Sequence, residues 1–212
     1  MTQDGTRQRL LRAAGEIISR KGFRAATVRE ICARAEANVA SVKYHFGNKR
    51  RLYEEVLRAA FEESVRAHPP DPGPDFPPAE RLRAFIRSLV FRLHGSGRGS
   101  WFGMLLTREM YEPTEALDQL VQRAIRPMST LLQEMVRELG GLGLDDRAVL
   151  FCGLSVAAQC QHFFRSSEVV RRLYPSLRFD RQGLEELVEH ILAFSLAAIE
   201  NYRRADSAGG RP

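Results

Sequence analysis

Side chains of the types that bind DNA are concentrated between Thr27 and Lys49. Lysine can donate to O6 and N7 of guanine, and hydroxyl, imidazole and ammonium groups can contact phosphate oxygens. Within this stretch Lys43 is the candidate for reading a base edge. The candidates for phosphate contacts are Thr27, Tyr44, His45 and Lys49. These residue types indicate an interaction with duplex DNA, provided that local structure presents them together.

The same stretch contains the signals for two short helices joined by a tight turn. Thr27 and Glu30 have the spacing of a capping box, which starts a helix. Asn38 is a favourable N-cap for a second helix, expected over residues 39–46. Two such helices form a helix-turn-helix, a motif that places its second helix in the major groove.

The second helix must divide its faces between the protein core and the DNA. Val42 and Phe46 are four residues apart, so both are expected on the buried face. Ala40 and Ser41 are small enough to let the backbone approach the groove, and Val39 or Ala40 can touch a thymine methyl group.

Charge is distributed unevenly along the chain. Residues 1–51 contain 12 Lys and Arg against 4 Asp and Glu, whereas the remaining 161 residues contain 20 against 22. All three lysines (Lys21, Lys43 and Lys49) lie in the basic segment. A basic domain is the electrostatic signature of a phosphate-bearing partner.

The whole chain is expected to be all-α, because apolar residues recur at helical spacing and no strand pattern is evident. We predict a helix-turn-helix domain at 1–51, a helical effector-binding and dimerisation domain at 52–204, and a disordered tail at 205–212. Expected helices outside the motif cover residues 7–21, 48–67, 79–94, 101–111, 114–139, 145–164, 167–174 and 180–203. Gly22 is expected to end the first of them, and Asn48, Asp145 and Asp180 are expected to cap the helices that they begin. Pro127 either kinks the 114–139 helix or opens a second one, and the glycine-rich stretch 95–99 is expected to be a loop.

The motif resembles the N-terminal domain of the TetR family of transcriptional regulators. The matching residues are Gly22-Phe23, Thr27 to Ile31, Ala35 and Tyr44 to Lys49. Segments 105–121 and 125–136 are similar to the C-terminal domain of the CecR branch of that family. The resemblance implies phosphate contacts from Thr27, Tyr44, His45 and Lys49, and base contacts from Arg29 and Lys43.

Three positions depart from the usual family pattern. Glu36 occupies the turn position where glycine is common, and Ala26 replaces a frequent threonine. Lys43 stands where relatives often have tyrosine, so the base preference of relatives does not transfer to this chain.

A specific regulator of this kind needs two reading helices, which predicts a homodimer on a palindromic operator. The late helices are the most apolar, and the resemblance implies a four-helix bundle between two copies. The residues expected at this interface are Leu150, Leu154, Ala158, Leu187, Ile191, Phe194, Ser195 and Ala198.

The middle of the chain mixes aromatic side chains and methionines with a few polar groups, which suits a mainly apolar effector cavity. The alternative is an ordinary hydrophobic core. The residues expected to line the cavity are Phe85, Leu89, Trp101, Met104, Leu105, Arg108, Met128, Leu132, Gln159, His162 and Phe163.

Other classes of protein are less consistent with the sequence. No catalytic triad, paired carboxylates or zinc-protease motif is evident, so we expect neither an enzyme nor a metal or cofactor. No apolar run is long enough to span a membrane and no signal peptide is evident, so a cytoplasmic protein is expected. The open alternatives are a nonspecific or architectural DNA-binding protein and a helical protein–protein adaptor.

Overall fold

The computed structural model describes residues 3–95, 100–141 and 144–207, and this part of the chain is helical without a strand. The described helices form two compact units. Unit 1 comprises residues 1–67 and 95–125, and unit 2 comprises residues 68–94 and 126–212. The units therefore divide the chain differently from the expected boundary at residue 51, because later helices pack with the helix-turn-helix.

Unit 1 begins with three helices, α1 (Gln3–Lys21), α2 (Val28–Arg34) and α3 (Ala40–Phe46). Gly22 ends α1 as expected: its φ of 84° lies in the left-handed region, and its N–H donates to the carbonyl of Ile18. The fourth helix, α4 (Lys49–Ala67), packs on both α1 and α3. Asn48 caps α4 as predicted, because its side-chain oxygen accepts the N–H of Arg51 at 2.9 Å.

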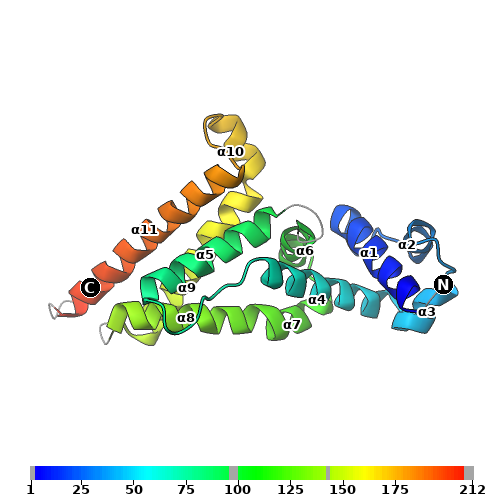
Figure 1. Ribbon diagram of the computed structural model, residues 1–212, viewed down its shortest axis with the longest axis horizontal. Coiled ribbons are helices and arrows are strands. Elements are labelled where there is room, and N and C mark those ends of the chain that lie inside the picture. The colour runs from blue at the N-terminus through cyan, green and yellow to red at the C-terminus, as the bar shows by residue number, and fades with distance from the viewer. Residues whose placement is uncertain (1–2, 96–99, 142–143, 208–212) are drawn as a thin grey trace. The chain divides into compact units, whose positions relative to one another are not determined.

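Unit 1 is completed by α6 (Ser100–Tyr111), α7 (Ala116–Leu120) and a π-helical turn, η2 (Val121–Ile125). Helix α6 packs against α1 and α4 (Figure 1). The buried Glu109 carboxylate joins these elements by accepting hydrogen bonds from the Tyr53 hydroxyl at 2.7 Å and from Thr114. Arg108 donates to the carbonyls of Ser19 and Arg20, which holds α6 against the end of α1.

Unit 2 contains α5 (Pro78–His94), α8 (Arg126–Gly140), α9 (Asp146–Arg165), α10 (Ser167–Leu173) and α11 (Arg181–Ser207). Helices α5, α8, α9 and α11 pack on one another (Figure 1). Asp145 and Asp180 cap α9 and α11 as expected, through hydrogen bonds from the N–H groups of Ala148 and Gly183. The segment 68–77 is tied to this unit by Arg81, which bridges Asp71 and Glu138.

Pro127 is the second residue of α8 and directly follows a π-turn, within a helical run that continues unbroken from residue 116 to residue 140. Its ring would clash with the carbonyl of Arg123, four residues earlier, in a regular α-helix. The wider π-turn η2 contains Arg123 and accommodates this proline.

Two other expectations differ from the structure or fall outside it. Helix α11 continues to Ser207, so residues 205–207 extend the helix into the segment expected to be disordered. The remainder of that tail and residues 96–99 of the expected glycine loop lie outside the described residues.

Cys32, Cys152 and Cys160 are buried free thiols, as small hydrophobic residues would be.

Candidate DNA interface

The capping box at the start of α2 is fully formed. The Thr27 hydroxyl accepts the N–H of Glu30 at 3.2 Å, and the Thr27 N–H donates to the Glu30 carboxylate at 3.0 Å. The pKa of Glu30 is lowered to about 2, mainly by the hydrogen bond from the Lys21 ammonium and to a smaller extent by the hydrogen bonds from Thr27. The exposed Thr27 hydroxyl also donates to the Glu30 carboxylate at 3.1 Å, so in this structure both donors of Thr27 are engaged with Glu30.

The turn between α2 and α3 contains the one non-glycine residue with a positive φ among the described residues. Glu36 has a φ of 49°, in the left-handed region that glycine adopts without steric cost. The turn is closed by a hydrogen bond of 3.0 Å from the N–H of Ala37 to the carbonyl of Cys32. The departure from the family's usual glycine is therefore accommodated by backbone strain at Glu36 rather than by a different turn.

Asn38 stabilises the start of α3, but it lies one residue before the N-cap position and not at the N-cap position as predicted. Its side-chain oxygen accepts the N–H of Ala40 at 2.8 Å. Val39 occupies the N-cap position, so the helix begins at Ala40 rather than at Val39. This shift of one residue leaves the faces of the helix as predicted.

Helix α3 buries two side chains and exposes the predicted reading face. Val42 and Phe46 are buried in unit 1, as expected from their spacing. Tyr44 is 70% exposed and Val39 is 50% exposed, and Ala40 and Lys43 are also exposed. Ser41 and His45 are half-buried. The expected exposure of Lys43 and Tyr44 is confirmed, whereas their contacts with DNA remain predictions.

Lys49 provides a positive charge at the start of α4. Its Nζ lies 4.5 Å from the centroid of the Phe23 ring and 3.5 Å from the carbonyl oxygen of Arg24. Partial burial lowers its pKa, and the nearby Glu30 carboxylate opposes this effect. Phe23 in turn stacks on Tyr53 of α4, with ring centroids 4.9 Å apart. The ammonium is therefore positioned by aromatic packing.

Arg24 is a candidate that the sequence motif did not single out. It is exposed in the loop before α2, and its carbonyl lies beside the Lys49 ammonium. The concentration of basic residues in segment 1–51 was the available signal. Arg29, expected to contact a base, is exposed in the first turn of α2.

The residues expected to line an effector cavity are divided between the two units. Trp101, Met104, Leu105 and Arg108 lie on α6 of unit 1. The others lie on α5, α8 and α9 of unit 2: Phe85, Leu89, Met128, Leu132, Gln159, His162 and Phe163. Arg108, expected as a polar anchor, instead donates to the carbonyls at the end of α1. Trp101 packs directly against Gly15 of α1.

The expected dimer interface requires a correction on α11. Ile191 is 0% exposed and Ser195 is 4% exposed, because both face the interior of unit 2. Leu187 and Ala198 are half-buried, whereas Phe194 is 59% exposed. The exposed stripe of α11 runs through Ala193, Phe194 and Ala197. The sequence periodicity identified the apolar helix correctly but assigned part of its core face to the surface.

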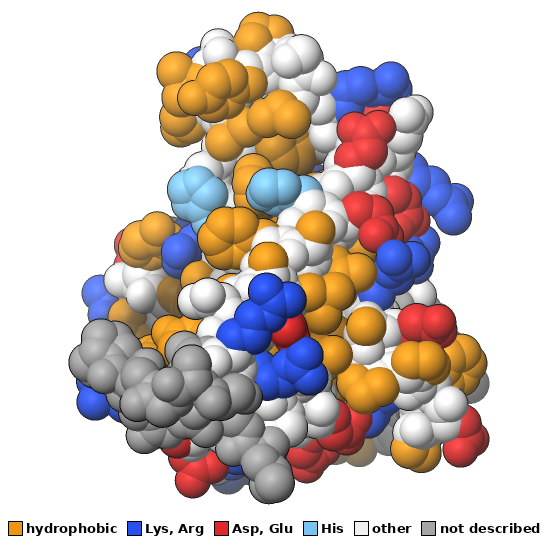
Figure 2. Space-filling view, turned by 90° about the vertical axis from the view of Figure 1, so that its left-hand side faces the viewer, with side chains coloured by type: hydrophobic (Ala, Val, Ile, Leu, Met, Phe, Trp, Pro, Cys, Tyr) orange, Lys and Arg blue, Asp and Glu red, His pale blue; other side chains and the backbone are white. Residues whose placement is uncertain are grey.

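On α9 the expected interface residues are exposed. Leu150 and Leu154 are exposed large hydrophobic residues, and Phe151 and Ala158 lie on the same side of the helix. Val169 and Leu173 of α10 are also exposed, and Figure 2 shows hydrophobic side chains gathered over this helix at the top of the view. Unit 2 therefore presents apolar surface on three helices.

No group of three or more His, Cys, Asp and Glu side chains in the described part of the chain could hold a metal ion. Among the described helices, none combines the length and apolar character needed to cross a membrane.

Comparison with known proteins agrees with this arrangement. Residues 10–56 match the family of bacterial regulatory proteins called tetR, and residues 78–199 match the C-terminal domain of the HTH-type transcriptional dual regulator CecR. The chain is 27% identical to the HTH-type transcriptional repressor NicS of Pseudomonas putida, over 77% of each chain. It is 26% identical to CecR of Shigella flexneri, over 76% of each chain.

The fold is shared with solved structures. A bacterial regulatory protein of the tetR family from Rhodococcus RHA1 superposes with a TM-score of 0.70, at 16% identity, over 92% of this chain and 96% of that one. The CecR match spans more than half of the chain and lies C-terminal to the helix-turn-helix match. The chain therefore belongs to the TetR family of bacterial regulatory proteins, carries the C-terminal domain of the CecR branch, and is a DNA-binding transcriptional regulator rather than an enzyme.

Proposed function

We propose that this regulator is a homodimeric repressor that binds a palindromic operator in the bacterial cytoplasm and leaves it when a small, mainly apolar effector binds. The observation that carries the DNA-binding part is the division of α3, which buries Val42 and Phe46 and presents Lys43 and Tyr44 to solvent. Repression needs no surface beyond the one that occupies the promoter.

The reading face combines specificity with positioning. Lys43 donates to guanine, Arg29 reaches a neighbouring base edge, and Val39 or Ala40 contacts a thymine methyl group. Phosphate contacts from the remaining polar and basic side chains fix the register of the helix on the duplex. These residues are Arg24, Thr27, Ser41, Tyr44, His45 and Lys49.

Dimerisation places two reading helices about 34–36 Å apart, which matches successive major grooves on one side of the DNA. We assign the interface to the exposed apolar stripes of α9 and α11 in unit 2. On α9 it includes Leu150, Phe151, Leu154 and Ala158, and on α11 it includes Ala193, Phe194 and Ala197. The small alanines beside Phe194 allow the helices of two copies to pack closely.

The effector acts by a shift of population between two conformations. In one conformation the two reading helices match adjacent grooves, and in the other they do not. The effector must have the higher affinity for the second conformation, because equal affinity for both would change nothing. Support comes from α5, α8 and α9, which pack together in unit 2 and carry Phe85, Leu89, Met128, Leu132 and Phe163.

Selection of DNA sequences bound by the purified protein, followed by footprinting, tests the proposal. The expected result is a palindrome whose two half-sites are each protected, with an affinity that falls steeply as salt rises. Equal affinity for random DNA would support a nonspecific binder instead. No retention of any duplex at low salt would contradict the proposed function altogether.

A further inference from the structure

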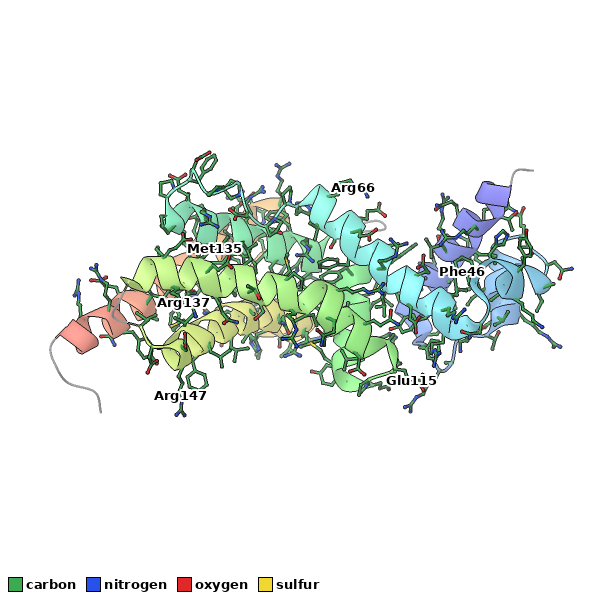
Figure 3. The ribbon with its side chains drawn as sticks, turned by 90° about the horizontal axis from the view of Figure 1, so that it is seen from below. Phe46, Arg66, Glu115, Met135, Arg137 and Arg147 are labelled. Carbon is green, nitrogen blue, oxygen red and sulfur yellow. The ribbon has the colours of Figure 1, made fainter. Side chains whose placement is uncertain are left out.

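A groove inside unit 1 lies directly beside the helix that we assign to DNA reading. It has a volume of about 690 Å³ and is lined by residues of α1, α3, α4, α7 and η2. This volume falls within the range of small-molecule sites in proteins. Figure 3 shows Phe46 beside the first turns of α4, with Glu115 at the start of α7. None of the residues that we expected to line an effector cavity lies in this groove.

The groove has an apolar floor. Phe46, Leu57 and Leu120 contribute to its lining and are otherwise almost fully buried in the core of unit 1. Phe61 adds a half-buried aromatic ring, which also packs against Phe102 at a centroid distance of 5.7 Å. Such a floor gains free energy by covering the apolar body of a ligand.

The rim of the groove is charged, with four arginines against three glutamates. Glu55 accepts hydrogen bonds from Arg7 at 2.7 Å and from Arg58 at 2.8 Å, and Arg58 also binds Glu62 at 2.9 Å. The hydrogen bond from Arg58, and to a smaller extent that from Arg7, holds the pKa of Glu55 below its usual range. The charges of this cluster are therefore already committed to one another.

Two arginines of the rim remain without a carboxylate partner in the described part of the chain. Arg51 lies in the first turn of α4, and Arg123 lies on the π-turn η2. The third glutamate, Glu54, lies 3.6 Å from Arg50, a residue outside the lining. Arg50 also pairs with Glu115, the N-cap of α7, and so links α4 to the start of α7, two elements that both contribute to the lining. The rim thus carries an excess of positive charge that an anion would satisfy.

The groove also reaches α3 itself. His45 and Phe46, the last two residues of that helix, belong to its lining. His45 is among the side chains that we assign to phosphate contacts. A molecule in the groove would therefore compete for His45 and alter the packing that holds α3 in place.

We propose that this groove binds an organic anion with an apolar body, such as an aromatic monocarboxylate, whose carboxylate is held by Arg51 and Arg123 and whose bound state weakens DNA binding through His45 and Phe46. Guanidinium groups suit a carboxylate because their fixed donors match its two oxygens. The effect on DNA rests on the proposed function, whereas binding of the anion does not.

Calorimetric titration with 2-naphthoate, in the absence of DNA, tests the binding site. We expect saturable binding that weakens about tenfold in Arg51→Gln and in Arg123→Gln, since each loses a charged hydrogen bond. Gln119→Trp, which fills the groove from an exposed lining position, should abolish it. Arg66→Gln is the matched control, because Arg66 is exposed in the last turn of α4 and outside the lining (Figure 3).

Two related probes separate the parts of the proposal. The neutral 2-naphthylmethanol has the same ring system without the charge, and inorganic phosphate has charge without the apolar body. Each should bind at least about tenfold more weakly than 2-naphthoate. Absence of 2-naphthoate binding, equal binding of either probe, or unchanged binding in both arginine variants with folded thermal transitions would overturn the site.

Operator binding in the presence and absence of 2-naphthoate tests the coupling. We expect the anion to weaken DNA binding in the unmodified chain and in Arg66→Gln, but not in Arg123→Gln. If the anion binds without changing DNA affinity, the coupling is wrong although the site stands. If DNA itself is never bound, the proposed function fails, and the calorimetric result still decides the site.

Discussion

Single side chains in the helix-turn-helix either hold its shape or face solvent, and the two lysines beyond the turn differ in this respect. Lys43 is fully presented on α3, whereas Lys49 is packed over the Phe23 ring beside the Arg24 carbonyl. An exposed ammonium group on a reading helix can donate hydrogen bonds to a base edge. An ammonium group held in place at the start of a helix is suited to contact the phosphate backbone instead. The two should therefore contribute to different properties of DNA binding.

We predict that Lys43→Ala changes which base is preferred at one operator position, with a cost of about 1–3 kcal/mol for the original base. Lys49→Gln should instead weaken binding to all sequences alike and reduce the salt dependence by about one ion. Titration of an operator and its single-base variants over a range of salt concentrations measures both. Equal losses on every sequence for Lys43→Ala would contradict its base-reading role, and Lys49→Arg serves as the charge-conserving control.

Glu36 is strained by its left-handed backbone conformation, which costs most residues about 1–2 kcal/mol. We predict that Glu36→Gly raises the free energy of unfolding by up to about 1 kcal/mol, because glycine adopts this conformation freely but loses more entropy on folding. Glu36→Ala removes the same charge and keeps the strain, so it should not stabilise. Denaturant titration of the two variants measures the difference, and a stabilised alanine variant would indicate a charge effect instead.

His94 is packed between aromatic rings in unit 2, with Phe164 at 5.2 Å and Phe179 at 5.6 Å. Its Nε2 has no hydrogen-bond partner among the described residues. Burial, with a smaller effect from Arg171, lowers the pKa of His94 from 6.5 to about 4. The unfolded chain therefore binds more protons than the folded chain between these two pKa values.

The free energy of unfolding should consequently be insensitive to His94 above its unfolded pKa of 6.5 and should fall as pH decreases toward 4. We predict that His94→Phe, which keeps a ring and removes the titration, loses part of this decline. Denaturant midpoints of both proteins at the two ends of the window provide the measurement. Parallel pH profiles would show that His94 is protonated equally in the folded and unfolded states.

Whole elements in unit 1 depend on a close approach between α1 and α6. A Cβ atom at Gly15 would lie 2.2 Å from the Trp101 ring, a distance at which the indole must move. We predict that Gly15→Ala destabilises the protein by about 1–3 kcal/mol through overpacking, although alanine favours helix. Thermal unfolding gives the magnitude.

Gly153 in α9 provides the matched control for this substitution. A Cβ atom there would meet its neighbours at 3.8 Å, an ordinary contact. Gly153→Ala should therefore be neutral or stabilising, since alanine is the better helix former. If both substitutions had the same effect, contact with Trp101 would not be the reason for glycine at position 15.

At the scale of the whole molecule, the exposed stripes of α9 and α11 should decide whether two copies associate. We predict that Phe194→Glu converts the dimer to a monomer, because it places an unpaired charge in an apolar contact. The variant should lose affinity for a palindrome while it retains weak, salt-dependent binding to any duplex. Analytical ultracentrifugation and operator titration measure the two effects.

Phe76→Glu is the control, because Phe76 is exposed in the segment 68–77, away from these stripes in the sequence. It should leave both the molecular mass and operator affinity unchanged. A dimeric Phe194→Glu variant would contradict the assignment of this face. A monomeric unmodified chain would contradict the proposed symmetric operator as well.

Local signals in the sequence determined the helices, their caps and the reading face of α3. Capping boxes, proline positions and four-residue apolar spacing act over one or two turns, so they can be read without knowledge of packing. This is why the burial of Val42 and Phe46, and the caps at Asn48, Asp145 and Asp180, were predicted correctly.

Only the tertiary structure decided which distant helices share a core. Helix α6 belongs to unit 1 because it packs against α1 and α4. The residues expected to line the effector cavity are therefore divided between the two units, and Arg108 donates to a carbonyl of α1. Helix α11 carries apolar residues on more than one of its faces, so its sequence does not show which face is buried. Packing against the other helices of unit 2 buries Ile191 and leaves Phe194 exposed. The groove beside α3 is lined by both Arg51 and Arg123, which are 72 positions apart in the sequence, and no local pattern encodes that they share one groove.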